Sequence, residues 1–97
     1  MKKMDKEEFK KEAKKSLNEI FARIDELEAK RDKAKADSRA EYEEKVARLK
    51  SQKNDLQEKY DNLINASDEK WEEAKQAFSS ASDSFKEGFS KIASLLS

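Results

Sequence analysis

Adjacent carboxylates are the residues of this sequence that come nearest to catalytic chemistry. They occur as Glu7-Glu8, Glu43-Glu44 and Glu72-Glu73. General acid–base catalysis needs a carboxyl group in a closed pocket that shifts its pKa. Neighbouring side chains on a helix point roughly 100° apart, so such pairs do not converge on one point. They indicate a solvated surface with salt bridges between residues i and i+4, such as Glu26–Lys30.

Residues for other kinds of site are missing from the composition. The chain has no His and no Cys, so the usual metal-binding patterns, including the Glu-x-x-His pair of ferritin-like bundles, cannot form. Its only glycine, Gly88, stands alone and cannot make a phosphate-binding loop. The sequence therefore predicts a protein that is not an enzyme, with no catalytic residues, no metal and no cofactor.

The charge balance bounds the partners and the location. Lys and Arg number 22 and Asp and Glu number 22, so the net charge is zero, which argues against nucleic acid as a partner. No run approaches the ~20 apolar residues that span a bilayer, and the N-terminal stretch lacks the apolar core of a secretory signal. We expect a cytoplasmic protein with one domain over residues 1–97.

Hydrophobic spacing sets the fold class. With 45% charged and 35% hydrophobic residues, one Gly and no Pro, the chain must be either disordered or helical with a narrow apolar seam. Steps of four and three connect Ala13, Leu17, Ile20, Ile24 and Leu27, and they resume from Tyr42 to Leu63. The pattern is a heptad repeat and predicts an all-α protein. An eleven-residue step from Ser38 to Leu49 marks a stutter in the repeat.

The last third of the chain has the densest apolar stripe. Large residues recur every seven positions, at Trp71, Phe78, Phe85 and Ile92. Small residues, Gly88 among them, alternate with these large ones and allow a neighbouring helix to approach closely. Because Phe89 widens the stripe, this helix is expected to meet two neighbours. Aromatic burial predicts that stability is concentrated here.

The position of the chain reversals separates two architectures. Asn65, Ser67 and Asp68 are preferred helix N-caps and predict a turn at residues 65–67. A long helix over residues ~5–64 and a second helix over 68–96 would then form a coiled-coil hairpin. Its exposed N-terminal half would need an antiparallel mate.

A second break near residues 37–39 gives the alternative. Ser38 and Glu41 have the spacing of a capping box, but the preceding Lys/Ala stretch favours a continuous helix. With this break the chain becomes a monomeric three-helix bundle of nearly equal segments. Continuity is slightly favoured.

The seam residues are the candidate interaction sites. We expect a homodimer, or a contact with another protein, through an oligomer and packing interface. Its predicted members are Leu17, Ile20, Ile24, Leu27, Arg31, Leu49, Leu56, Leu63, Trp71, Phe78, Phe85, Phe89 and Ile92. Arg31 could set the register of the pairing or extend its charge to solvent.

Several strings resemble a family of small bacterial coiled-coil proteins that is associated with stress. The matching segments are Ile24-Asp25, Leu27 to Lys30, Lys33 to Asp37, Glu41 to Glu44, and Asp68 with Trp71 to Glu73 and Lys75. The resemblance covers about Ile20 to Phe89, and its Trp71 segment is the most specific part. It implies a helical coiled-coil protein with no established enzymatic role.

These observations favour a structural or protein–protein interaction function without catalysis, in a stress-associated setting. The alternative is that residues 68–96 form an amphipathic helix that binds a lipid surface, since small Ser residues lie opposite bulky apolar ones. That segment carries six acids and four Lys, a poor match for an anionic membrane.

Overall fold

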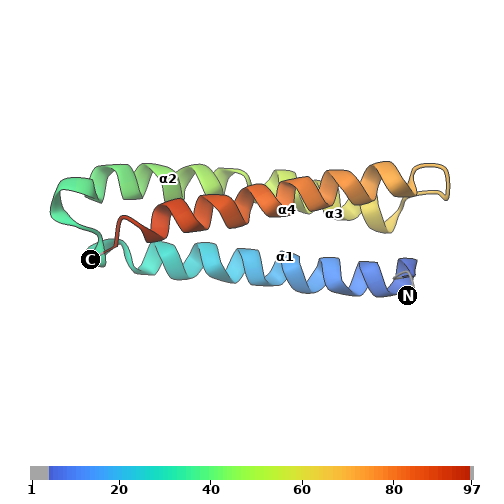
Figure 1. Cartoon of the computed structure of the whole chain (residues 1–97), viewed down its shortest axis with the longest axis horizontal. Helices are drawn as coiled ribbons and strands as arrows, with labels where there is room; N and C mark the ends of the chain where they lie inside the picture. Colours follow the sequence, from blue (N-terminus) through green and yellow to red (C-terminus); the bar gives the residue numbers. More distant parts are fainter. Residues whose placement is uncertain (1–4, 97) are drawn as a thin grey trace.

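Three helical rods lie side by side in the computed structural model, which describes residues 5–96 (Figure 1). The elements in chain order are α1 (Lys6–Ala29), η1 (Arg31–Lys33), η2 (Ala36–Ser38), α2 (Arg39–Ser51), α3 (Lys53–Ile64) and α4 (Trp71–Ala93). The bundle measures 50 × 27 × 16 Å, and no strand is assigned within residues 5–96. The predicted all-α class is confirmed.

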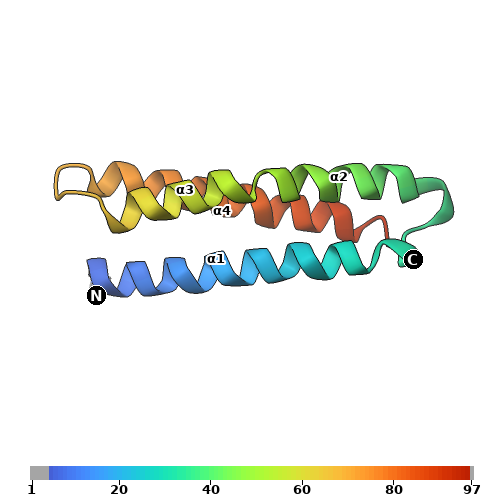
Figure 2. The same ribbon diagram turned by 180° about the vertical axis from the view of Figure 1, so that it is seen from behind.

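The middle rod runs against the other two. Helices α2 and α3 follow each other end to end, as the view from behind shows (Figure 2), while α1 and α4 run parallel to each other. At one end Lys6 of α1 forms an ion pair with Asp68 of the α3–α4 turn. At the other end the Lys35 N–H donates to the carbonyl oxygen of Leu95 at 3.0 Å. Both ends of the bundle are therefore held by contacts between distant segments.

Helix α1 begins and ends with defined backbone hydrogen bonds. The side chain of Asp5 accepts from the Glu8 N–H at 2.8 Å, and Glu7 and Glu8 suit the positive end of the helix dipole. At the other end the Lys30 N–H donates to the carbonyl oxygens of Glu26 and Leu27. The chain then turns back through η1 and η2.

The continuous helix expected over residues ~5–64 is therefore wrong, because α1 stops at Ala29 and α2 begins at Arg39. The seam positions in between, Arg31, Ala34 and Ser38, are too polar or too small to support a helix by packing. Reversing the chain there lets Leu17 to Leu27 pack inside the same molecule, which outweighs the helix propensity of the Lys/Ala stretch.

The core runs the length of the bundle and is made almost wholly of the seam residues. It comprises Ala13, Leu17, Ile20, Ile24, Leu27, Ala34, Tyr42, Val46, Leu49, Leu56, Leu63, Trp71, Phe78, Phe85 and Ile92. The N-terminal seam, expected to be exposed for a second chain, is instead buried, with Leu17 and Ile24 each 1% exposed. A single chain covers its own heptad stripe.

A one-residue break at Gln52 separates α2 from α3. The hydroxyl of Ser51 donates to the carbonyl oxygen of Arg48 at 2.7 Å, and such back-bonding bends helices. The Gln52 N–H still donates to the carbonyl oxygens of Arg48 and Leu49, so the rod bends without ending. The break lies just after the stutter expected between Ser38 and Leu49.

The turn between α3 and α4 spans residues 65–70 and includes the 65–67 turn expected from sequence. Helix α4 begins at Trp71, three residues later than expected, and no side chain caps its N-terminus. The Asp68 carboxylate pairs with Lys6, and the Lys70 N–H donates to the carbonyl oxygen of Ser67 at 3.1 Å. Helix α4 ends at Ala93 rather than near residue 96.

Candidate functional site

Most of the predicted interface residues lie inside the molecule rather than on a surface. Eleven of the thirteen are buried, and they come from all of the longer helices. These are Leu17, Ile20, Ile24, Leu27, Leu49, Leu56, Leu63, Trp71, Phe78, Phe85 and Ile92. Heptad spacing identified them correctly as packing residues, since a seam looks the same whether it faces its own chain or another.

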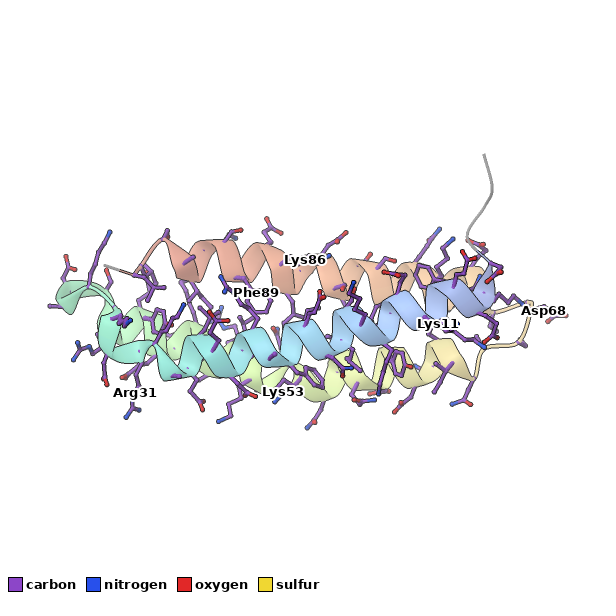
Figure 3. All side chains as sticks on the ribbon, turned by 90° about the horizontal axis from the view of Figure 1, so that it is seen from below. Lys11, Arg31, Lys53, Asp68, Lys86 and Phe89 are labelled. Atoms are coloured by element: carbon purple, nitrogen blue, oxygen red, sulfur yellow. The ribbon has the colours of Figure 1, made fainter. Side chains whose placement is uncertain are left out.

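The two remaining residues have different positions. Arg31 lies exposed in η1 and occupies no seam, because the helix that would have carried the seam has already ended (Figure 3). A register-setting role for Arg31 within a buried seam is therefore wrong. Phe89 is half-buried on α4 beside the buried Phe85, with the two ring centroids 6.3 Å apart.

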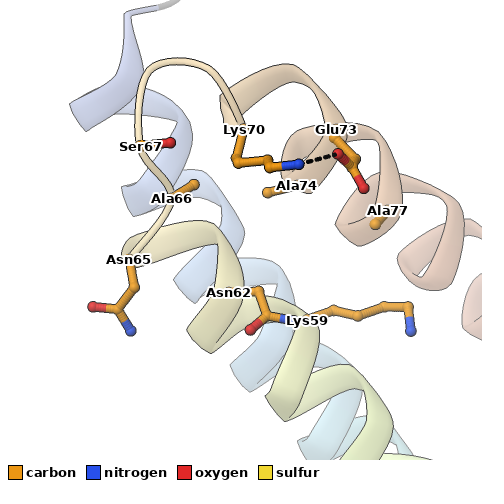
Figure 4. A pocket seen from close by; sticks show the side chains of 9 residues that line it. All are labelled: Lys59, Asn62, Asn65, Ala66, Ser67, Lys70, Glu73, Ala74 and Ala77. Atoms are coloured by element: carbon orange, nitrogen blue, oxygen red, sulfur yellow. Dashed lines mark ion pairs between the residues drawn. The ribbon is translucent and has the colours of Figure 1, made fainter.

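An open groove of about 460 Å³ lies between α3 and α4, next to their turn (Figure 4). Ala66, Ala74 and Ala77 are among its lining residues, and polar side chains complete the rim. Its two lysines already have partners, since Lys70 pairs with Glu73 at 3.7 Å and Lys59 with Asp55 at 3.1 Å. The groove can accept a small apolar group, and its cations are satisfied without a ligand.

The carboxyl groups whose pKa values are shifted belong to exposed ion pairs. Hydrogen bonding from Lys30 lowers the pKa of Glu26, and Lys50 lowers the pKa of Glu28 in the same way. Lys6 likewise lowers the pKa of Asp68. Each shift favours the charged form that an acid already has at neutral pH. None of them prepares a carboxyl group to donate or accept a proton near pH 7.

The acidic side chains of the helices do not converge on a common point. Within residues 5–96 no group of three acidic, His or Cys side chains is placed to hold a metal ion. The adjacent carboxylates Glu43 and Glu44 lie exposed on α2, and Glu72 and Glu73 lie exposed on the first turn of α4. Their arrangement is that of a charged surface.

Lysines cover several aromatic rings at the surface of the bundle. The ring of Trp71 meets Phe9 edge-on at 5.8 Å, and the ammonium groups of Lys6 and Lys10 lie 5.5 and 6.0 Å from the Trp71 centroid. Lys75 lies 5.4 Å from the Phe9 centroid. The same kind of contact, a lysine ammonium group over an aromatic ring, joins α1 and α3 at two places. Sequence spacing gave no signal for these pairs, because their members lie on different helices.

A smaller groove of about 230 Å³ lies between α1 and α4. Its lining residues are Ser16, Glu19, Ile20, Arg23, Lys86 and Phe89. Lys86 and Phe89 occupy successive turns of α4, next to α1, in the view from below (Figure 3). This groove combines an aromatic ring with charges of both signs, as do the hollows lined by Tyr42 and by Tyr60.

The apolar face of α4 is turned into the bundle. Trp71, Phe78, Phe85 and Ile92, which form the apolar face of α4, are all packed against the other helices. Among residues 5–96 no helix has the length and apolar character needed to cross a membrane.

Comparison with known proteins returned no match at any level. No family model, no curated protein and no solved structure matches the chain.

Proposed function

We propose that this chain is a structural or protein–protein interaction protein that acts by contact, without catalysis, and that a second copy of itself is among its partners. The observation that carries the proposal is that apolar and charged side chains are separated between the core and the surface. The apolar seam is buried within one chain, and the surface consists of charged side chains and open grooves. Such a surface offers contacts rather than a closed reaction chamber.

Ion pairs between helices support a rigid contact surface. Lys50 of α2 pairs with Glu28 of α1 at 2.8 Å, and Lys53 of α3 approaches Asp25 of α1 at 4.0 Å. Because these pairs join different rods, they favour one register between the rods. The resemblance to stress-associated bacterial coiled-coil proteins favours the same class of function, since that family has no established enzymatic role.

Sedimentation velocity over a wide concentration range tests the self-association. We expect a concentration-dependent increase in the sedimentation coefficient from that of the 11.2 kDa monomer towards that of a dimer. A single species of 11.2 kDa up to millimolar concentration would remove self-association from the proposal. Because the core is complete in one chain, the monomer should stay folded on dilution, as circular dichroism would report.

The lipid-surface alternative has weaker support. Binding through α4 would require the bundle to open and release Phe78 and Phe85 from the core. Flotation with neutral and anionic vesicles, followed by Trp71 fluorescence, separates the two functions. A blue shift together with co-flotation would favour the lipid surface over the contact function.

A further inference from the structure

The half-buried aromatic rings of the bundle differ in whether a lysine side chain covers them. Four such rings occur among residues 5–96, and three have a lysine ammonium group over them. The covered rings are Phe9 (Lys75, 5.4 Å), Phe21 (Lys53, 4.9 Å) and Tyr60 (Lys14, 5.4 Å). Phe89 is the fourth, and within the same residues no lysine or arginine stacks on it. An incoming apolar group therefore meets no ammonium group over this ring.

Two of the three charged side chains that line this groove have no ion-pair partner among residues 5–96. Glu19 on α1 and Lys86 on α4 line the same groove, and both are exposed. Neither side chain forms an ion pair within residues 5–96. The third charge, Arg23, already pairs with Glu26 at 3.1 Å. Among residues 5–96, the groove thus presents one unpaired anionic side chain and one unpaired cationic side chain, on opposite walls.

A patch of this kind is complementary to itself. In a two-fold contact, residue i of one copy meets residue j of the other, and residue j of the first meets residue i of the second, so each contact occurs twice. If the axis runs along the groove, the α1 wall of one copy faces the α4 wall of the other. Glu19 then meets Lys86 of the second copy, Lys86 meets its Glu19, and the two Phe89 rings meet near the axis.

We propose that the α1–α4 groove around Phe89 is the self-association surface of this protein, with the helices of the two copies parallel. This inference rests on the proposed function and specifies its contact. It differs from the antiparallel arrangement expected from sequence, because the residues that would have formed that interface are buried. The groove is small, so the dimer is weak and reversible, as is usual for interfaces below ~1,200 Å².

Charge reversal provides the decisive test, by sedimentation velocity on the full chain. Glu19→Lys leaves two lysines facing each other across the axis, and Lys86→Glu leaves two glutamates. Each single variant should weaken dimerisation at least ~10-fold, which corresponds to ~1.4 kcal/mol. The double variant Glu19→Lys/Lys86→Glu restores opposite charges across the axis and should restore dimerisation. Phe89→Ala should weaken it by a similar factor.

A matched control uses a charge pair outside the groove. Glu28 and Lys50 pair within one chain, on α1 and α2, so the double variant Glu28→Lys/Lys50→Glu should dimerise like the wild type. Circular dichroism of every variant checks that the fold is kept, which is expected because Glu19 and Lys86 are exposed.

The outcomes separate this inference from the proposed function. If the wild type dimerises and the variants at Glu19, Lys86 and Phe89 dimerise equally well, the groove is not the interface, while self-association stands. If single reversals weaken the dimer but the double variant does not recover, the parallel pairing is wrong. A wild type that stays monomeric would instead contradict the self-association itself.

Discussion

The hydroxyl of Tyr42 donates a hydrogen bond to the backbone carbonyl oxygen of Leu27, 15 residues earlier in the chain. Tyr42 lies in the first part of α2 and is fully buried, while Leu27 lies in the last turn of α1. The same carbonyl oxygen also accepts from the Lys30 N–H of the closing turn, because the helix ends before it can supply the usual i+4 donor. The Tyr42 hydroxyl therefore ties α2 to the point where α1 ends, across the η1–η2 turn.

Removal of this hydroxyl should cost a measurable part of the stability. For Tyr42→Phe we expect the free energy of unfolding to fall by ~1 kcal/mol, because one buried hydrogen bond is lost and the ring remains. For Tyr42→Ala the loss should reach ~3–5 kcal/mol, since a cavity is added. Urea denaturation followed by circular dichroism measures both. Equal stability of Tyr42→Phe and wild type would show that the hydrogen bond contributes nothing net.

The same residue gives the bundle a dependence on alkaline pH. Burial raises the pKa of Tyr42 above its ordinary value of 10.0. Above pH ~10 the unfolded chain releases this proton while the folded chain keeps it, so unfolding becomes more favourable as pH rises. The contribution of the neutral hydroxyl is complete below that pH and is lost as pH passes the raised value.

Tyr42→Phe is the control for this effect, because lysine titration is common to both proteins. The difference in unfolding free energy between wild type and Tyr42→Phe should shrink between pH 9 and 11. A difference that stays constant over this range would show that the tyrosine proton is not linked to folding.

Charges placed in the N-terminal seam should unfold the whole molecule. Leu17 and Ile24 are each 1% exposed, so Leu17→Asp with Ile24→Asp puts two unpaired carboxylates into the core. That cost is comparable with the ~5–15 kcal/mol that stabilises a typical domain. Near-UV circular dichroism and Trp71 fluorescence should lose their native signals together. A Trp71 region that stays folded would mean that α1 packs against another chain.

Gly88 sets the distance between α4 and α2. A Cβ atom at this position would lie 3.2 Å from Cδ2 of Leu49, the flexible end of that side chain. For Gly88→Ala we expect a stability change within ~1 kcal/mol, since the helix propensity gained offsets the tight contact. Gly88→Leu should destabilise by ~1–3 kcal/mol, because its larger side chain forces the helices apart. Thermal unfolding measures both, and equal effects would contradict a close approach here.

Heptad spacing was enough to predict that the chain is helical and which apolar residues form its core. The step pattern from Ala13 to Leu27, and the seven-residue repeat from Trp71 to Ile92, are the buried faces of α1 and α4. This works because an α-helix places every third or fourth residue on one side, whatever lies against it. The 45% of charged residues and the single Gly then leave no other fold class.

The surface features could not be predicted in this way. Lys14 covers Tyr60 and Lys53 covers Phe21 across a helix boundary, so no spacing along the chain relates them. The pairing of Lys6 with Asp68 also joins residues far apart in sequence. Phe89 stays half-buried because of which side chains of the neighbouring helices reach it, and spacing along the chain does not give this.

The sequence by itself determined which residues are apolar, how they are spaced and therefore that long amphipathic helices form. Only the tertiary structure decided where the chain turns back, at residues 30–38, and so which seam covers which. The physical reason is a competition between two terms. Local helix propensity favours continuity through the Lys/Ala stretch, whereas burial of Leu17 to Leu27 requires reversal. Burial is a property of the folded whole, and it prevails here.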